Sequence, residues 1–481
     1  MALLLGLPGP AGAVRIGLIE GVPVAPEATP PSAALAAAIE GLKQKDAAAA
    51  LKAAREVVKS HPGSALAHEV HGAAALLGRE FKEAEGALGQ ALKLDPRRAS
   101  AMVRLGQLAL ETGDPKKAEQ WLRKALDASS DIGPVARRIL SVALMRQGRL
   151  QAALAEAQES VRLSGGQDAG AKYLLGAIYH EVGRPAEAEK ALAEVVAADP
   201  GSASALVLLG LVKLELRKTD EAALLLERVV QRDPGSQWAR LGLSLIQRSR
   251  GQLDQARGEL EKLTRERPDW ALAQFELGRT LLLQRQRDQA LGAFERAEKQ
   301  SPDPALVRVR AGHALLAVGE FDQAIEKGKA ALGSPTAAPF ARALLVQAYL
   351  ATGKADLAEQ ELQAAASAAP QDPAPLMRLG RFYLAQRRPK EALAQFEQAE
   401  KVRPQVVEPL AAQAETHLAL NQGSQAVRLA ERVVKAQGET ADAYLFLGAI
   451  QERSGRRADA ATAYQKALER EAHHIGAARA R

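Results

Sequence analysis

The sequence lacks cysteine entirely and is poor in aromatic residues, which make up 4% of its 481 residues. Without cysteine the sequence predicts no disulfide, no thiol nucleophile, no thiolate metal site and no lipid anchor on an N-terminal cysteine. The small aromatic content means that alanine and leucine must supply most of the packing. No run of eighteen apolar residues occurs, so the sequence predicts no transmembrane helix.

The sequence also lacks the usual signatures of catalysis and cofactor binding. No glycine-rich phosphate loop, HExxH motif or GxSxG motif is present. His61, His68 and His71 lie near one another in the sequence but have no set of coordinating partners, so we interpret them as surface histidines. The formal net charge of +7 is spread among interleaved acidic and basic residues, as expected for a solvated surface. We therefore predict no enzyme activity, no metal site and no cofactor.

A 34-residue period is present from residue 31 to residue 474, in thirteen copies. Such a period indicates one supersecondary unit stacked on copies of itself. Every copy has alanine at its twentieth position: Ala50, Ala84, Ala118, Ala153, Ala188, Ala222, Ala256, Ala290, Ala324, Ala358, Ala392, Ala426 and Ala460. The eighth position is glycine, serine or alanine in all copies except the tenth, which has Val346. Small residues at these two positions predict a close approach of two helices in each copy.

Glycine and proline mark the boundaries of the two helices. The fifteenth position is glycine in seven copies and Asn421, the only asparagine of the chain, in an eighth. These residues favour the left-handed conformation that follows a helix end. The thirty-second position is proline in eight copies, which stops the second helix before the next copy begins. Each copy is therefore predicted to be a helix, a short turn, a second helix and a loop.

This pattern resembles the tetratricopeptide repeat family, over residues 31–474. The resemblance implies an all-α fold, a right-handed superhelical solenoid of about 26 antiparallel helices without strands. It also implies that the first helix of each repeat lines the concave surface. A tail at residues 475–481 follows the last repeat. The family has no catalytic residues to transfer to this chain.

The first thirty residues differ in composition from the repeats. Residues 1–13 contain an apolar run and the small-residue site Ala11-Gly12-Ala13, which predicts a signal peptide, although its first part has no lysine or arginine. Residues 14–30 form a proline-rich linker. We expect an exported, periplasmic protein, and the alternative is a cytoplasmic protein with an unstructured N-terminal tail.

The positions that line the concave surface in the family are apolar in the central repeats, with arginines nearby. Aromatic residues beside arginine are typical of binding hot spots. The predicted partner-binding residues are Val207, Leu211, Trp238, Leu241, Leu245, Arg248, Trp270, Phe275, Arg279, Val309, His313 and Arg381. An apolar groove would suit an amphipathic helix or an apolar extended segment of a protein partner. The alternative interpretation is that these residues pack between neighbouring first helices.

The function that the sequence predicts is a non-enzymatic protein–protein interaction scaffold. If the protein is exported, it is similar in plan to bacterial envelope proteins that assemble exopolysaccharide or pilus secretion machinery. One alternative is a cytoplasmic adaptor in complex assembly or regulation. Another is the helical arm of a larger enzyme or outer-membrane protein, because the last repeat has no polar cap. The family's RNA-reading relatives need residues at code positions that this sequence lacks, so we predict no nucleic-acid binding.

Overall fold

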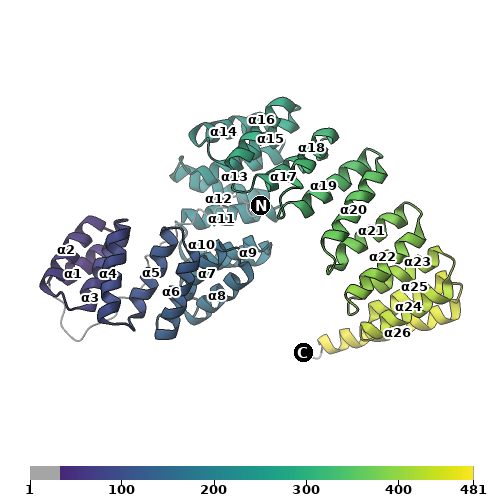
Figure 1. Ribbon diagram of the computed structural model, residues 1–481, viewed down its shortest axis with the longest axis horizontal. Helices are drawn as coiled ribbons and strands as arrows, with labels where there is room; N and C mark the ends of the chain where they lie inside the picture. The colour runs from purple at the N-terminus through teal and green to yellow at the C-terminus, as the bar shows by residue number, and fades with distance from the viewer. Residues whose placement is uncertain (1–32, 480–481) are drawn as a thin grey trace. The chain divides into compact units, whose positions relative to one another are not determined.

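The computed structural model describes residues 33–479, with side chains to residue 471. The predicted signal peptide at residues 1–13 and the linker at residues 14–30 lie outside the described residues. Within residues 33–479 the chain forms 26 α-helices and no strand. The predicted all-α fold of paired helices is therefore confirmed (Figure 1).

The helices alternate between first and second helices of successive repeats. The first helices are α1 (Ala33–Lys43), α3 (Ala65–Leu77), α5 (Ala99–Glu111), α7 (Gly133–Arg146), α9 (Ala169–Glu181), α11 (Ala203–Glu215), α13 (Gln237–Ser249), α15 (Ala271–Leu283), α17 (Pro304–Ala317), α19 (Ala338–Ala351), α21 (Pro373–Ala385), α23 (Glu408–Ala419) and α25 (Ala441–Arg453). The second helices are α2 (Ala47–Ser60), α4 (Phe81–Leu94), α6 (Pro115–Ala128), α8 (Leu150–Leu163), α10 (Pro185–Ala198), α12 (Thr219–Arg232), α14 (Leu253–Glu266), α16 (Arg287–Gln300), α18 (Phe321–Ala331), α20 (Ala355–Ala368), α22 (Pro389–Val402), α24 (Gly423–Ala436) and α26 (Arg457–Arg479). Helix α26 includes most of the stretch that the sequence predicted as a tail.

The chain divides into two compact units, one ending at Pro302 and the other beginning at Asp303. The first unit contains α1–α16 and the second contains α17–α26. Within each unit a helix contacts mainly the helices before and after it in the chain. This nearest-neighbour pattern is expected of a repeat protein, in which each unit buries its apolar face only against adjacent copies.

The two small positions of the regular repeats lie where the two helices of a repeat meet closely. Each alanine at the twentieth position is buried, with at most 2% of its surface exposed. In every repeat with glycine at the eighth position except the ninth, that glycine faces the large residue at the twenty-fourth. A β-carbon added at Gly278 would lie 2.6 Å from the ring of Phe294, and one at Gly106 would lie 2.7 Å from Leu122. A larger residue at these sites would push the two helices apart.

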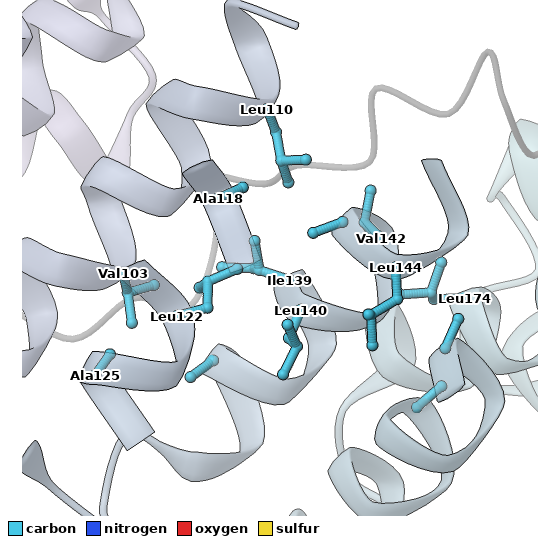
Figure 2. Packing of buried hydrophobic residues seen from close by; sticks show 14 of the residues in the cluster. Val103, Leu110, Ala118, Leu122, Ala125, Ile139, Leu140, Val142, Leu144 and Leu174 are labelled. Atoms are coloured by element: carbon cyan, nitrogen blue, oxygen red, sulfur yellow. The ribbon is translucent and has the colours of Figure 1, made fainter. Parts of the chain in front are cut away.

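Leucine, isoleucine and valine fill the space between successive helix pairs. Figure 2 shows this packing in the third to fifth repeats, where Leu122 of α6 lies between Val103 of α5 and Ile139 of α7. Ile139, Leu140 and Leu122 have no exposed surface. The apolar core is thus continuous from one repeat to the next in this part of the first unit, with Trp121 and Tyr179 packed against it.

The predicted left-handed residue follows the first helix in all thirteen repeats. The seven glycines at the fifteenth position have φ between 72° and 84°, and Asn421 has φ 59°. The other five repeats carry lysine or arginine there, and these residues adopt the same conformation: Lys45, Arg79, Arg217, Arg285 and Arg387. Left-handed backbone costs an L-residue with a β-carbon about 1–2 kcal/mol. The repeat geometry therefore holds five basic residues in a conformation that they would not choose alone.

Glycine should relieve this strain at the exposed positions. We expect Arg217→Gly, Arg285→Gly and Arg387→Gly each to stabilise the chain by about 0.5–1 kcal/mol, since relief of the left-handed strain exceeds the entropic cost of glycine. The measurement is the denaturation midpoint of each variant. Arg428→Gly is the matched control, because Arg428 is exposed inside α24, where glycine is unfavourable by up to about 1 kcal/mol. If all four variants are equally destabilised, the strain is absent.

The ninth repeat departs from the common packing in a way that the sequence analysis missed. Its twenty-fourth position is Gly328, and its second helix α18 has 11 residues where most have 14. Side chains of the next helix occupy the space left by the missing large residue. A β-carbon at Gly328 would lie 2.9 Å from Leu345, and one at Gly312 would collide with Leu344. Helix α19 thus packs into the ninth repeat more deeply than the regular pattern requires.

Candidate functional site

The twelve predicted binding residues all belong to first helices, except Trp270, which immediately precedes α15. Nine of them lie in the first unit, on α11, α13 and α15 or next to them. Val309 and His313 on α17 and Arg381 on α21 lie in the second unit. The predicted site therefore falls into two groups, one in each unit.

Five of the twelve residues are buried within the helix array. Trp270 is 6% exposed and Phe275 is 4% exposed, and Val207, Leu241 and Val309 are also buried. The rest reach the surface: Leu211, Trp238, Leu245, Arg248, Arg279 and His313 are half-buried, and Arg381 is exposed. The buried residues pack between neighbouring helices, and only the others are accessible to a partner.

The aromatic residues of the first unit form two contacts. The rings of Trp238 and Trp270 lie 5.0 Å apart at an interplanar angle of 73°, an edge-to-face arrangement that aromatic pairs favour. The Arg267 guanidinium lies 5.4 Å from the centre of the Trp270 ring. Phe275 of α15 packs against Phe294 of α16, with ring centres 5.4 Å apart. Trp238 is thus the aromatic side chain of this group that remains accessible, and it packs on the buried ring of Trp270.

The two arginines of the first group share a buried carboxylate that the sequence analysis did not predict. Glu276 of α15 is 1% exposed, and its carboxylate accepts hydrogen bonds from Arg248 at 2.6 Å and Arg279 at 3.2 Å. Burial alone would raise the pKa of Glu276, but the charges and hydrogen bonds of Arg248 and Arg279 outweigh burial and lower that pKa. Arg248 thereby joins α13 to α15. The only feature of the sequence that marks the Arg248–Glu276 pair is that Glu276 is the single acidic residue of a largely apolar helix.

Of the three histidines predicted to lie at the surface, His71 is half-buried and contacts an acidic residue. His71 of α3 lies 2.7 Å from Glu83 of α4, and Arg55 of α2 also pairs with that carboxylate. The hydrogen bond from Arg55 is the main reason that the pKa of Glu83 falls to about 2. Burial, and then the charge of Arg310, lower the pKa of His313. Among the described residues no group of three or more histidines and carboxylates is placed to hold a metal ion.

Sequence models of the tetratricopeptide repeat match the chain at residues 71–131, 173–237, 275–342, 343–406 and 411–474. Related models of the same repeat match residues 213–275 and 134–159. The chain belongs to the tetratricopeptide repeat family. No curated protein matches the sequence. Within residues 33–479, no helix is both long and apolar enough to cross a membrane.

Three solved tetratricopeptide repeat structures illustrate the similarity. A tetratricopeptide repeat protein from Parabacteroides merdae is 20% identical, with a TM-score of 0.44, over 52% of this chain and 98% of its own. YrrB, described as a TPR protein with an unusual peptide-binding site, is 22% identical, with a TM-score of 0.32, over 39% of this chain and 96% of its own. PilF of Pseudomonas aeruginosa is 20% identical, with a TM-score of 0.37, over 42% of this chain and 91% of its own.

Proposed function

We propose that this tetratricopeptide repeat protein is a non-enzymatic scaffold that binds protein partners along its first helices. The observation that carries the proposal is a set of half-buried apolar side chains on the adjacent helices α11 and α13. Leu211 and Leu214 of α11 and Trp238 and Leu245 of α13 all keep part of their surface accessible. Neighbouring helices α11 and α13 contact each other, so these side chains lie on adjoining elements.

Buried aromatic and ion-paired residues support this surface. Trp270 and the Arg248–Glu276–Arg279 cluster fix α13 against α15, next to Trp238. A half-exposed tryptophan over a buried support, with arginine nearby, has the composition of a binding hot spot. Tetratricopeptide repeat proteins are in general scaffolds without catalytic groups. An apolar or amphipathic segment of a partner is the ligand that such a surface favours.

A double substitution on α13 tests the proposal. Partners are first identified by crosslinking in the native cell and then titrated in purified form against the full chain. We expect Trp238→Ala with Leu245→Ala to weaken partner binding more than tenfold, because hot-spot truncations cost about 2 kcal/mol or more. Leu224→Ala is the control, since Leu224 is 68% exposed on the second helix α12. Equal affinities of all three proteins, with circular dichroism unchanged, would reject this surface.

We also propose that the protein is exported and acts in bacterial envelope assembly, of the exopolysaccharide or pilus secretion kind. Support for this proposal comes only from residues 1–30: the apolar run, the small-residue site Ala11-Gly12-Ala13 and the proline-rich linker. A mature N-terminus near Val14 in the periplasmic fraction is the expected result. An intact Met1 in the cytoplasm would favour the cytoplasmic adaptor instead.

A further inference from the structure

A groove of about 550 Å³ lies in the second unit, among the helices α19, α20 and α21. These three helices lie in the green part of the chain in Figure 1. The apolar side chains that line the groove include Ala343, Val346 and Leu350 of α19, Leu362 of α20 and Phe382 of α21. Its volume falls within the usual range of ligand-binding clefts, about 300–1,000 Å³.

The groove occurs at the one repeat that lacks a small residue at its eighth position. Val346 occupies the eighth position of the tenth repeat, where the other repeats have glycine, serine or alanine. A β-branched side chain at this position keeps the first and second helices from the close contact that glycine permits. Val346 and Leu362, the eighth and twenty-fourth positions of this repeat, both line the groove. The departure from the repeat pattern thus coincides with the cavity.

Helix α21 makes little contact with the first helices on either side of it, α19 and α23. Helix α19 packs against α17, and α23 packs against α25, whereas α19 and α21 do not pack closely on each other. Helix α19 lies deep in the ninth repeat because Leu344 and Leu345 fill the space beside Gly312 and Gly328. Phe382 of α21 borders the groove on the side of the next repeat.

Two arginines without partners stand beside this apolar floor. Arg378 and Arg381 of α21 line the groove, and both are exposed. Neither makes a hydrogen bond or ion pair with any described residue, whereas Arg342, on the opposite wall, pairs with Glu361 at 2.7 Å. Leu350, 44% exposed, contributes apolar surface to the same wall. The groove therefore combines apolar surface with uncompensated positive charge at one edge.

We propose that this groove binds an acidic amphipathic segment of another protein. A large apolar side chain of that segment enters the groove over Val346 and Leu362, and its carboxylates pair with Arg378 and Arg381. The guanidinium group suits such pairing because it binds a carboxylate through two parallel hydrogen bonds. The proposal rests on the proposed scaffold function but concerns a separate surface, in the other unit from Trp238. It assigns the second unit its own specificity for negative charge.

Peptide selection on the purified full chain carrying Trp238→Ala with Leu245→Ala, which removes the proposed first-unit surface, tests this specificity. Three display libraries of random twelve-residue peptides are compared: glutamate with leucine and phenylalanine, lysine with the same apolar residues, and glutamate with serine in place of the apolar residues. We expect enrichment from the first library alone. Absence of enrichment from that library overturns the proposal, and so does stronger enrichment from the lysine library. Tighter binding of a single-stranded oligonucleotide than of the selected peptides also overturns it.

Charge-reversal variants then locate the binding. Selected peptides should bind Arg378→Glu with Arg381→Glu at least about tenfold more weakly, because the carboxylates lose their partners and meet like charge. Arg428→Glu with Arg453→Glu makes the same change of net charge at exposed arginines of the second unit that do not line the groove. This control should change the affinity less than twofold. Equal weakening by both double variants would mean non-specific attraction and overturn the proposal.

A variant that fills the groove distinguishes binding inside the apolar groove from attraction to the arginines at its edge. Ala343→Phe occupies the floor without changing charge and should also weaken peptide binding about tenfold, with circular dichroism unchanged. If Ala343→Phe unfolds the chain, Ala385→Phe on the exposed edge of the groove replaces it. Peptides that bind all groove variants normally overturn this proposal and leave the scaffold function intact. Conversely, a native partner that binds the Trp238→Ala with Leu245→Ala variant normally would reject the proposed first-unit surface and leave the groove proposal intact.

Discussion

Replacing Glu69 by alanine is expected to destabilise the N-terminal repeats by about 3–5 kcal/mol, the usual cost of removing one partner from a buried ion pair. Glu69 of α3 has no exposed surface. Its carboxylate pairs with Arg98, accepts a hydrogen bond from Ser100 at 2.9 Å and meets Arg104 at 3.4 Å. Both arginines are themselves almost fully buried. Alanine would leave two buried guanidinium groups without the carboxylate that they share.

The loss of stability caused by Glu69→Ala should be confined to the repeats around α3, because each repeat of such an array contacts only its neighbours. Chemical denaturation measures its size, and hydrogen exchange in α3–α5 measures its position. Glu85→Ala is the matched control, since Glu85 of α4 pairs with Lys117 at the surface and such pairs contribute at most about 1 kcal/mol. A Glu69→Ala protein as stable as the control would mean that water or a shifted arginine compensates the charge.

The sequence was sufficient to predict the fold because the same physical constraint recurs in every repeat. Alanine at the twentieth position marks the closest helix contact, and the structure buries every such alanine. Glycine at the fifteenth position predicted the left-handed turn. Arg217, Arg285 and Arg387 show the limit of local preference, because they adopt the same turn against their own propensity. In these repeats the register with neighbouring copies, and not the residue itself, determines the conformation.

The candidate site was harder to predict because accessibility depends on the neighbours of each side chain. Trp238 and Trp270 both occupy positions that line the groove in the family, yet Trp270 is buried beneath Trp238. The partner of Arg248 is an acid in the next repeat, Glu276, whose role no motif marks. The groove beside Val346 results from two irregular repeats acting together. Periodicity identifies the regular positions of the repeat. The Arg248–Glu276 pair joins two different repeats, and the groove lies where the pattern is broken, so periodicity marks neither of them.

Replacing Phe275 by alanine is expected to destabilise the first unit by about 3–5 kcal/mol, as for other buried phenylalanines. Phe275 is 4% exposed and packs against Phe294, which has no exposed surface. Phe294 in turn fills the space opposite Gly278, where the two helices of the eighth repeat meet. Truncation at Phe275 would open a cavity beside this contact, and the surrounding helices are too constrained to close it fully.

Phe340→Ala provides the matched control for Phe275→Ala. Phe340 is 53% exposed on α19, so its truncation should change stability by less than about 1 kcal/mol. Denaturant titration of both variants, followed by circular dichroism, measures the difference. The sequence left open whether Phe275 contacts a partner or packs within the array, and this comparison decides between the two. A Phe275→Ala chain with normal stability and impaired partner binding would place the phenylalanine in the binding surface. A chain with lowered stability, and with normal binding wherever it remains folded, would assign it to the core, where its burial against Phe294 puts it.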